Sequence, residues 1–197
     1  MVNMKNPLKQ SLLNILRSSE FEISIRKAGK FRFPSNYMFG RHNHQEFEMN
    51  YIASGNCVME IDGMLFMLKS GDLVLISPGV AHYFMVGAQR GCSITQLEYK
   101  ISLPEDVSGP FQFMYGREAS IQLNECYSIE NVMESVCRYY REHKDEDYSK
   151  AQIEFSFAQI YLEMAYALKQ NEKKENSELS NRQGNLLRYI NQNYDVK

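Results

Sequence analysis

The sequence predicts a mainly β fold, a barrel or sandwich of short strands followed by α-helices. Three observations support this fold class. Between Phe21 and about Leu123, apolar residues tend to recur at every second position, the period of a half-buried strand. Dipeptides that favour tight turns, such as Asp62-Gly63, separate the short apolar runs. From Ile129 onward the apolar period changes to that of an amphipathic helix.

The strand-rich region starts at residues 21–26, where Phe21, Ile23 and Ile25 alternate with polar residues. Further short apolar runs follow at residues 47–53, 57–61, 64–68, 73–76, 82–86 and 92–99. Many short strands separated by turn signals are typical of an all-β sandwich or barrel. Alternating β-α-β units would need a helix between successive strands, and no such helical pattern interrupts this region.

Two helices are expected after the strands. In residues 129–140 the apolar side chains form one helical stripe, and Ser128 offers an N-cap. Ser149 and Gln152 form a capping box at the start of a second helix, which extends to about Gln170.

The second helix is apolar on more than one face. One seam consists of Ile153, Phe157, Ile160, Met164 and Leu168. The other, which the chain's own domain need not cover, consists of Phe155, Leu162 and Tyr166. A surface helix needs only one apolar stripe, so the surplus favours a second copy of the chain in a two-fold homodimer. We assign Ile160, Tyr161 and Met164 to that interface. The alternative is that both seams are buried under the strands and the first helix.

Residues 170–184 are polar, and we interpret them as a linker or exposed loop. After them Leu186, Leu187 and Ile190 begin another amphipathic helix. The chain stops at Lys197 before that stripe can be buried, so we expect a partner domain that these residues do not include.

The charge balance argues against nucleic acid as a direct partner of these residues. The chain has 22 Lys and Arg against 24 Asp and Glu, a formal net charge of −2. A surface that neutralises DNA phosphates needs a basic surplus. The longest aliphatic or aromatic run, residues 64–68, is far shorter than the roughly 20 residues of a spanning helix, so we expect no membrane partner.

The cysteines and the N-terminus indicate a cytoplasmic protein. Four cysteines are spread over 197 residues without any C-x-x-C pair, as expected of small core residues in a reducing compartment. Residues 1–20 contain a short apolar cluster but no small-residue cleavage site, so we interpret them as an amphipathic arm that packs on the domain rather than a signal peptide.

Three of the four histidines fall in two short segments of the strand-rich region. His42 and His44 share one face if the chain there is an extended strand, and Glu48 has the same parity. His82 follows the turn at Pro78-Gly79, at the end of another strand. Three imidazoles and a carboxylate inside a small barrel would form a site for a divalent first-row metal with open coordination positions.

These residues resemble the two sequence motifs of the cupin superfamily. The first is His42-x-His44-x3-Glu48-x6-Gly55, and the second is Gly71-x5-Ser77-Pro78-Gly79-x2-His82. Three positions depart from the usual pattern, which has glycine at Asn36, proline at Ser77 and often asparagine at Val86. The four ligand positions are intact, whereas the departures weaken any assignment to an enzymatic subfamily.

Within the cupins, the stretch from His44 through Gly55 and from Gly71 to His82 is most similar to the sensory domain of AraC-type transcription regulators. That resemblance implies a cupin barrel (a double-stranded β-helix or jelly roll) followed by two or three α-helices. It divides the chain into a ligand-sensing barrel with an N-terminal arm at residues 1–123, a helical dimerisation segment at 124–172, and a linker with the first helix of a truncated helix-turn-helix domain at 173–197. It implies no catalytic activity, a small-molecule effector, and DNA contact only through a C-terminal domain that is absent here.

Several alternatives remain open at this point. His42, His44, Glu48 and His82 either hold a divalent metal (Zn, Ni, Fe or Mn), line an effector pocket without metal, or are a relic that only hydrogen-bonds across the barrel mouth. Asn50 and Phe84 share parity with the motifs, so we expect both to line the ligand pocket. The alternative function is a stand-alone metal-dependent cupin enzyme, a dioxygenase or isomerase.

Overall fold

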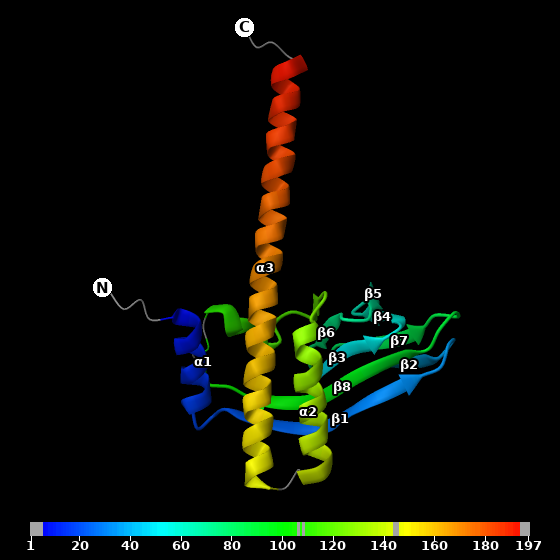
Figure 1. Cartoon of the computed structure of the whole chain (residues 1–197), viewed down its shortest axis with the longest axis vertical. Helices are drawn as coiled ribbons and strands as arrows, with labels where there is room; N and C mark the ends of the chain where they lie inside the picture. Colours follow the sequence, from blue (N-terminus) through cyan, green and yellow to red (C-terminus); the bar gives the residue numbers. More distant parts are fainter. Residues whose placement is uncertain (1–5, 106, 108, 144–145, 194–197) are drawn as a thin grey trace.

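The computed structural model describes residues 6–105, 107, 109–143 and 146–193. Nine strands lie between a short N-terminal helix and two C-terminal helices (Figure 1). The elements are α1 (Pro7–Arg17), β1 (Glu22–Phe33), β2 (Met38–His42), β3 (Phe47–Ser54), β4 (Asn56–Ile61), β5 (Met64–Lys69), β6 (Leu73–Ile76), β7 (His82–Val86), β8 (Cys92–Ser102), the 3-10 helix η1 (Gly109–Tyr115), β9 (Ser120–Leu123), α2 (Tyr127–His143) and α3 (Asp147–Asn193).

The strands form two antiparallel sheets. The five-stranded sheet has the order β1-β8-β3-β6-β9, and the four-stranded sheet has the order β2-β7-β4-β5. Apolar side chains from both sheets meet in one core; they include Ile52, Ile76 and Ile94 from the first and Met59 and Ile61 from the second. This arrangement, followed by α2 and α3, confirms the expected fold class.

The β4–β5 hairpin turns at the expected dipeptide. Asp62 and Gly63 both have positive φ angles, 51° and 80°. Two consecutive positive φ values characterise the type I′ turn, which matches the right-handed twist of the flanking strands. Of the nine strands, β2 and β9 lie outside the expected runs, because neither follows a long enough alternation to be recognised from sequence.

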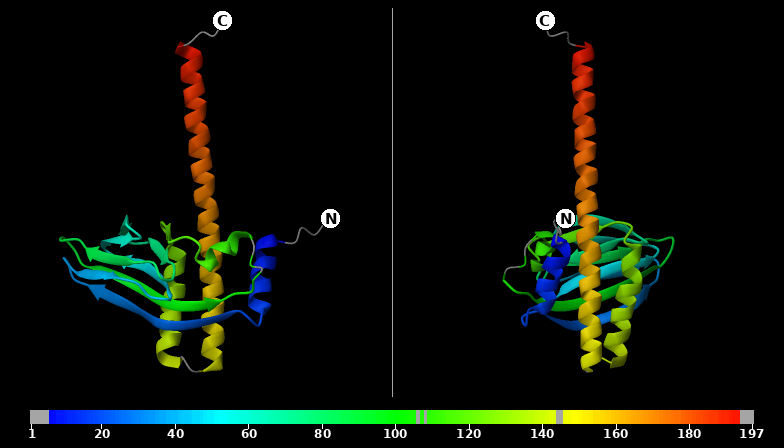
Figure 2. Two further views of the ribbon diagram at one scale, coloured as in Figure 1. Left: turned by 180° about the vertical axis from the view of Figure 1, so that it is seen from behind. Right: turned by 60° about the vertical axis from the view of Figure 1, so that its left-hand side comes forward.

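The outer face of the five-stranded sheet is covered by α2 and α3, which lie side by side against it (Figure 2). Alternate residues of β3 and β8, such as Met49, Tyr51, Leu97 and Tyr99, enter this second core. Their neighbours in sequence point to the space between the sheets, because successive side chains of a strand point to opposite faces. Both faces of β3 are therefore covered, which explains why six consecutive residues of it, 47–52, are buried.

The N-terminal arm is helical and packs on the domain. Asn6 caps α1 by accepting a hydrogen bond from the Lys9 backbone N–H through its Oδ1 at 3.2 Å. Ile15 is buried in the same core as α2 and α3. α1 contacts both η1 and α3, so the arm touches the element that leaves the barrel.

The expected linker at residues 170–184 is not a break in the structure. α3 is a single helix from Asp147 to Asn193 and continues well beyond the barrel (Figure 1). The stretch is polar but contains no proline, and glutamate, lysine and glutamine are good helix formers, so helix propensity sustains the helix without an apolar stripe. The side chains of Leu186, Leu187 and Ile190 lie outside the described residues.

The three residues expected at a dimer interface belong instead to the core of their own chain. Ile160, Tyr161 and Met164 are 0%, 1% and 0% exposed, because they lie on the face of α3 that packs on the sheet. The second seam is the open one, since Phe155 and Tyr166 are 65% and 60% exposed. Two apolar faces, one of them uncovered, were evident from sequence, but the three residues assigned to the interface lie on the buried face.

All four cysteines are free and buried, as expected of core residues. None of the helices in the described part of the chain is both long and apolar enough to cross a membrane.

Candidate metal centre

The three histidines and the glutamate come from both sheets and from the chain that joins them. His42 is the last residue of β2 and pairs in register with His82, the first residue of β7. Glu48 belongs to β3, in the opposite sheet. His44 lies in the loop that carries the chain from one sheet to the other, so the expected extended strand ends at His42. The cluster therefore lies between the sheets, at one end of the barrel.

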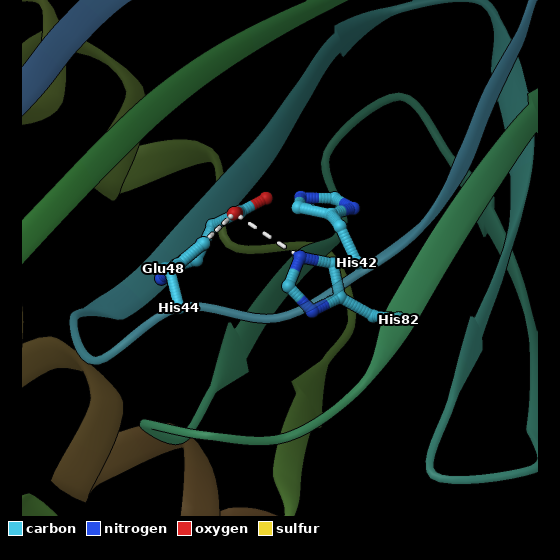
Figure 3. A group of neighbouring side chains, drawn as sticks. All are labelled: His42, His44, Glu48 and His82. Atoms are coloured by element: carbon cyan, nitrogen blue, oxygen red, sulfur yellow. Dashed lines mark hydrogen bonds and ion pairs between the residues drawn. The ribbon is translucent and has the colours of Figure 1, made fainter.

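The four side chains converge on a common point (Figure 3). One potential ligand atom from each residue lies within 4.8 Å of the others. His44 Nε2 is 2.8 Å and His82 Nε2 is 3.3 Å from the same oxygen, Glu48 Oε2. The His42 and His82 rings lie 4.3 Å apart, centroid to centroid.

Each imidazole is oriented by a backbone carbonyl. The Nδ1 atoms of His42, His44 and His82 lie 3.0, 3.1 and 2.9 Å from the carbonyl oxygens of Gly40, Glu46 and Val80. A carbonyl can only accept, so each Nδ1 donates a hydrogen bond to its carbonyl and Nε2 is the nitrogen left to meet a metal. This is the outer hydrogen bond that metal-binding histidines ordinarily make.

The second oxygen of Glu48 is held by two carboxamides. Asn50 Nδ2 and Gln96 Nε2 each donate a hydrogen bond of 2.7 Å to Glu48 Oε1. Glu48 is only 4% exposed, and a buried carboxylate is strongly unfavourable unless it is hydrogen-bonded or paired. The two amides fix the carboxylate so that Oε2 faces the histidines.

The cluster shifts the pKa values of its members in opposite directions. Burial opposes ionisation of Glu48, but hydrogen bonds from His44 and His82 outweigh it and hold the pKa of Glu48 well below its ordinary value. Burial also opposes protonation of His82, yet the hydrogen bond that His82 donates to Glu48 raises the pKa of His82. At His42 burial prevails and lowers the pKa. A metal requires an ionised carboxylate and neutral imidazoles, so the lowered pKa values of Glu48 and His42 favour metal binding, whereas a metal must displace the proton that the raised pKa of His82 favours.

The donor set fits a divalent transition metal. Three imidazole nitrogens and one carboxylate oxygen suit Zn, Ni, Fe and Mn, and the residues alone do not distinguish among these ions. Metal–ligand bonds of roughly 2.0–2.2 Å place opposite ligands about 4.2 Å apart, so small rotations would bring the four atoms into a coordination sphere. Ligation by His42, His44, Glu48 and His82 stays a prediction.

The sequence around this centre is similar to one protein family. Residues 29–120 match the family model described as the AraC-like ligand binding domain. This segment is similar to AraC-like ligand binding domains. It contains all four cluster residues and most of the barrel, and α2 and α3 follow it. No curated protein matches the chain.

The solved structures similar to the chain are remote. A cupin protein from Bacteroides fragilis is 20% identical at a TM-score of 0.35, over 42% of this chain and 69% of that one. A protein described as a predicted oxalate decarboxylase from Thermotoga maritima is 25% identical at a TM-score of 0.36, over 41% and 68%. The protein YhaK from Escherichia coli is 14% identical at a TM-score of 0.41, over 57% and 45%. Likenesses at this level say nothing about what the chain binds or catalyses.

The barrel has a cavity of about 400 Å³ beside the cluster. His42, Glu48 and His82 form one end of it, and Phe84 lines it. Asn50 lies behind Glu48, where its amide is engaged, and it is 1% exposed. Ligand contact by Phe84 and Asn50 stays a prediction.

Sequence reasoning missed several residues of this domain that surround the cavity. Gln96 and Glu98 lie on β8 directly opposite Asn50 and Glu48 on β3. Cross-strand partners share a face of the sheet, so they point to the same interior. The available signal was a pair of large polar residues at alternate positions of β8, between the apolar residues Ile94, Leu97 and Tyr99. Its meaning depended on the β3–β8 register, which joins segments distant in sequence.

Proposed function

We propose that the chain is the effector-sensing and dimerisation region of an AraC-type transcription regulator. The observation that supports this most directly is the cavity beside the buried cluster, inside a segment that matches the AraC-like ligand binding domain. Cavities of roughly 300–1,000 Å³ with an apolar lining and a few convergent polar groups are typical of small-molecule sites. The effector enters this cavity, and the chain itself performs no chemistry on it.

We further propose that His42, His44, Glu48 and His82 hold a divalent transition metal at the end of the cavity. Such an ion supplies a Lewis-acid position for an oxygen or nitrogen donor. The support is the orientation of the side chains: each imidazole directs Nε2 away from its backbone partner, and two amides occupy the far oxygen of Glu48.

The signal leaves the cavity through the five-stranded sheet and α3. Strand β8 carries Gln96 at the cavity and Tyr99 on the opposite face, where the Tyr161 hydroxyl of α3 donates to the Tyr99 hydroxyl at 2.8 Å. An effector changes the output only if it binds two arrangements of the barrel, α1 and α3 with different affinities. We propose that α3 leads to a DNA-binding domain, through which alone the protein contacts DNA.

A second copy of the chain is the proposed partner of α3. The exposed stripe that contains Phe155 and Tyr166 runs along one face of the helix, since residues eleven apart complete about three turns. A two-fold contact would cover these rings in both copies. We place the dimer in the cytoplasm, where the four free cysteines stay reduced.

The alternative, a metal-dependent cupin enzyme, is favoured by one observation, the complete set of four ligand residues. The two functions differ in the fate of the bound molecule. The test is a thermal-shift screen of the metal-loaded chain against small molecules, followed by mass spectrometry of every compound that binds. A sensor returns the compound unchanged and loses the thermal shift in Phe84→Ala. Conversion of a binding compound that stops in His82→Ala would establish the enzyme instead.

A further inference from the structure

The cavity beside the cluster has one wall built almost entirely of aromatic rings. Its aromatic residues are Phe31, Phe33, Tyr37, Phe39 and Phe84. Phe33 packs against Tyr37 and Phe84 with centroid distances of 4.9 and 4.7 Å, and Phe39 lies 6.4 Å from Phe84. Phe39 also meets the His42 ring edge to face at 4.7 Å, so the aromatic wall reaches the cluster itself.

These rings are only partly buried in the barrel core. Phe33, Tyr37 and Phe84 are half-buried, and Phe39 is 44% exposed. Rings that keep open faces toward a cavity gain most from a flat apolar guest, because stacked or edge-to-face rings are favourable beyond the area they bury. The aromatic wall therefore selects a planar ligand body.

The cavity lining also carries charge. Arg26 lies at a bulge of β1, Lys27 follows it, and both line the cavity with side chains about half exposed. Both ion-pair with Glu98, and the Lys27 Nζ–Glu98 Oε1 distance is 3.3 Å. Lys27 Nζ also lies 4.7 Å from the centre of the Phe31 ring, which places an ammonium group beside one of the aromatic rings.

The polar atoms of the cavity are already engaged with one another. Gln96 donates to Glu48, and Glu98 accepts from Arg26 and Lys27. A hydroxyl-rich ligand such as a sugar needs many free donors and acceptors, and displacing these pairs would leave buried groups unsatisfied. An anionic group can instead pair with Arg26 and Lys27 without displacing Gln96 or Glu98. The local carboxylates and cations roughly balance, so a divalent ion in the cluster would leave the site positive.

We propose that the ligand of this cavity is a small aromatic carboxylate, with its ring against Phe33, Tyr37 and Phe84 and its carboxylate between the cluster and Lys27. This inference rests on the proposed function, because it names the effector class of the same site. The cavity volume of about 400 Å³ lies near the lower end for small-molecule sites, which suits one or two rings.

The test is isothermal titration calorimetry on the Zn²⁺-loaded chain with matched probes. Benzoate, phenylacetate and 2-naphthoate are compared with benzyl alcohol and 2-naphthalenemethanol, which keep the rings but lack the charge. Cyclohexanecarboxylate keeps the charge but lacks the aromatic ring, and D-glucose represents hydroxyl-rich ligands. We expect at least one aromatic carboxylate to bind at least about 10-fold more tightly than each of the other classes, since a charge-assisted contact is worth about that factor.

Two variants locate the binding. Phe84→Leu keeps an apolar side chain but removes a ring. It should weaken binding of the aromatic carboxylate by about 2- to 12-fold, the range that one aromatic pair contributes. Lys27→Met removes the ammonium group. It should weaken binding of the aromatic carboxylate and leave the affinity for the matching neutral alcohol unchanged. Lys69→Met, at an exposed lysine of β5 outside the cavity lining, is the matched control. Circular dichroism confirms that each variant is folded.

The outcomes separate this inference from the proposed function. If D-glucose or a neutral alcohol binds better, and Phe84→Leu weakens that binding, the cavity is a ligand site but the carboxylate assignment is wrong. If no probe binds and the screen with Phe84→Ala also finds no compound in the cavity, both proposals are overturned. An aromatic carboxylate that binds Lys27→Met and Phe84→Leu as tightly as it binds the parent chain occupies another site, which also contradicts the inference.

Discussion

Gln96 Nε2 lies 2.7 Å from Glu48 Oε1, the carboxylate oxygen that faces away from the histidine contacts. Asn50 donates to the same oxygen at the same distance, so the two oxygens of Glu48 have separate partners. One is held by amides of β3 and β8, and the other meets His44 and His82. The amides thus present one oxygen to the centre of the cluster and keep a buried charge satisfied.

Replacing Gln96 by leucine should weaken metal binding without unfolding the barrel. The variant removes one of two donors to Glu48 Oε1 and leaves the four candidate ligands in place. Loss of an outer-shell partner typically costs 10- to 100-fold in metal affinity, and we expect about 10-fold because Asn50 remains. Competition titration with a chromogenic chelator measures the change. Gln122→Leu, on β9 of the same sheet, should bind metal like the parent chain, and equal affinities in all three proteins would refute the role of Gln96.

Metal binding should stabilise the folded chain. A ligand that binds only the native state contributes about 2.7 kcal/mol when its free concentration is 100 times Kd. We therefore expect Tm to rise by several degrees with Zn²⁺, Ni²⁺ or Mn²⁺ and to return to its starting value after chelation with EDTA. His82→Ala should abolish the rise and lower the bound metal from one ion per chain to none. An identical metal-dependent rise in His82→Ala would place the ion elsewhere.

The convergence of the four cluster residues could be predicted from sequence only through their motif spacing. The parity argument from His42 to Glu48 assumed one extended strand, whereas β2 ends at His42 and the chain crosses to the other sheet before Glu48. The residues still converge, because the crossing loop places His44 between the two strands. Gln96 was not predicted, since its relation to Glu48 depends on a strand pairing 48 residues apart in sequence.

Local patterns predicted most strands and both C-terminal helices, but not where the helices start: α2 begins at Tyr127 and α3 at Asp147, ahead of the expected caps Ser128 and Ser149. They also did not show that the three residues assigned to the dimer interface lie on the buried face of α3. Both seams repeat with helical period, and only packing on the sheet distinguishes Ile160 from Phe155. Polarity likewise suggested a loop at residues 170–184, although a polar sequence of good helix formers continues α3. Which face of a helix is buried depends on the elements that pack against it, whereas helix propensity depends on the residues of the helix itself.

The two seams of α3 should respond differently to substitution. Phe155→Glu and Tyr166→Glu place charge on the exposed stripe and should shift the chain from dimer to monomer with little loss of stability. Ile160→Ala removes buried methyl groups and should lower the free energy of unfolding by about 2–5 kcal/mol. Light scattering after size-exclusion chromatography gives the mass, and chemical denaturation gives the stability. A parent chain that is already monomeric at high concentration would contradict the proposed dimer.

The contact between Tyr161 and Tyr99 should be measurable as an energetic coupling between α3 and the sheet. Both rings are buried, and Tyr161→Phe leaves the Tyr99 hydroxyl without the partner it now has. We expect a loss of about 1–3 kcal/mol in either single variant and a smaller further loss in the double variant, because both partners are then apolar. Fully additive losses in a urea-denaturation cycle would show that the hydroxyls are not coupled.

The central claim is that occupancy of the cavity changes the state of α1 and α3. Hydrogen–deuterium exchange of the metal-loaded chain, with and without a compound that binds the cavity, tests it most directly. We expect slower exchange in β1, β2 and β7 around the ligand, together with altered exchange in α1 and in α3 around Tyr161, and neither effect in Phe84→Ala. Protection confined to the cavity strands, with α1 and α3 unchanged, would contradict a sensing role for this domain.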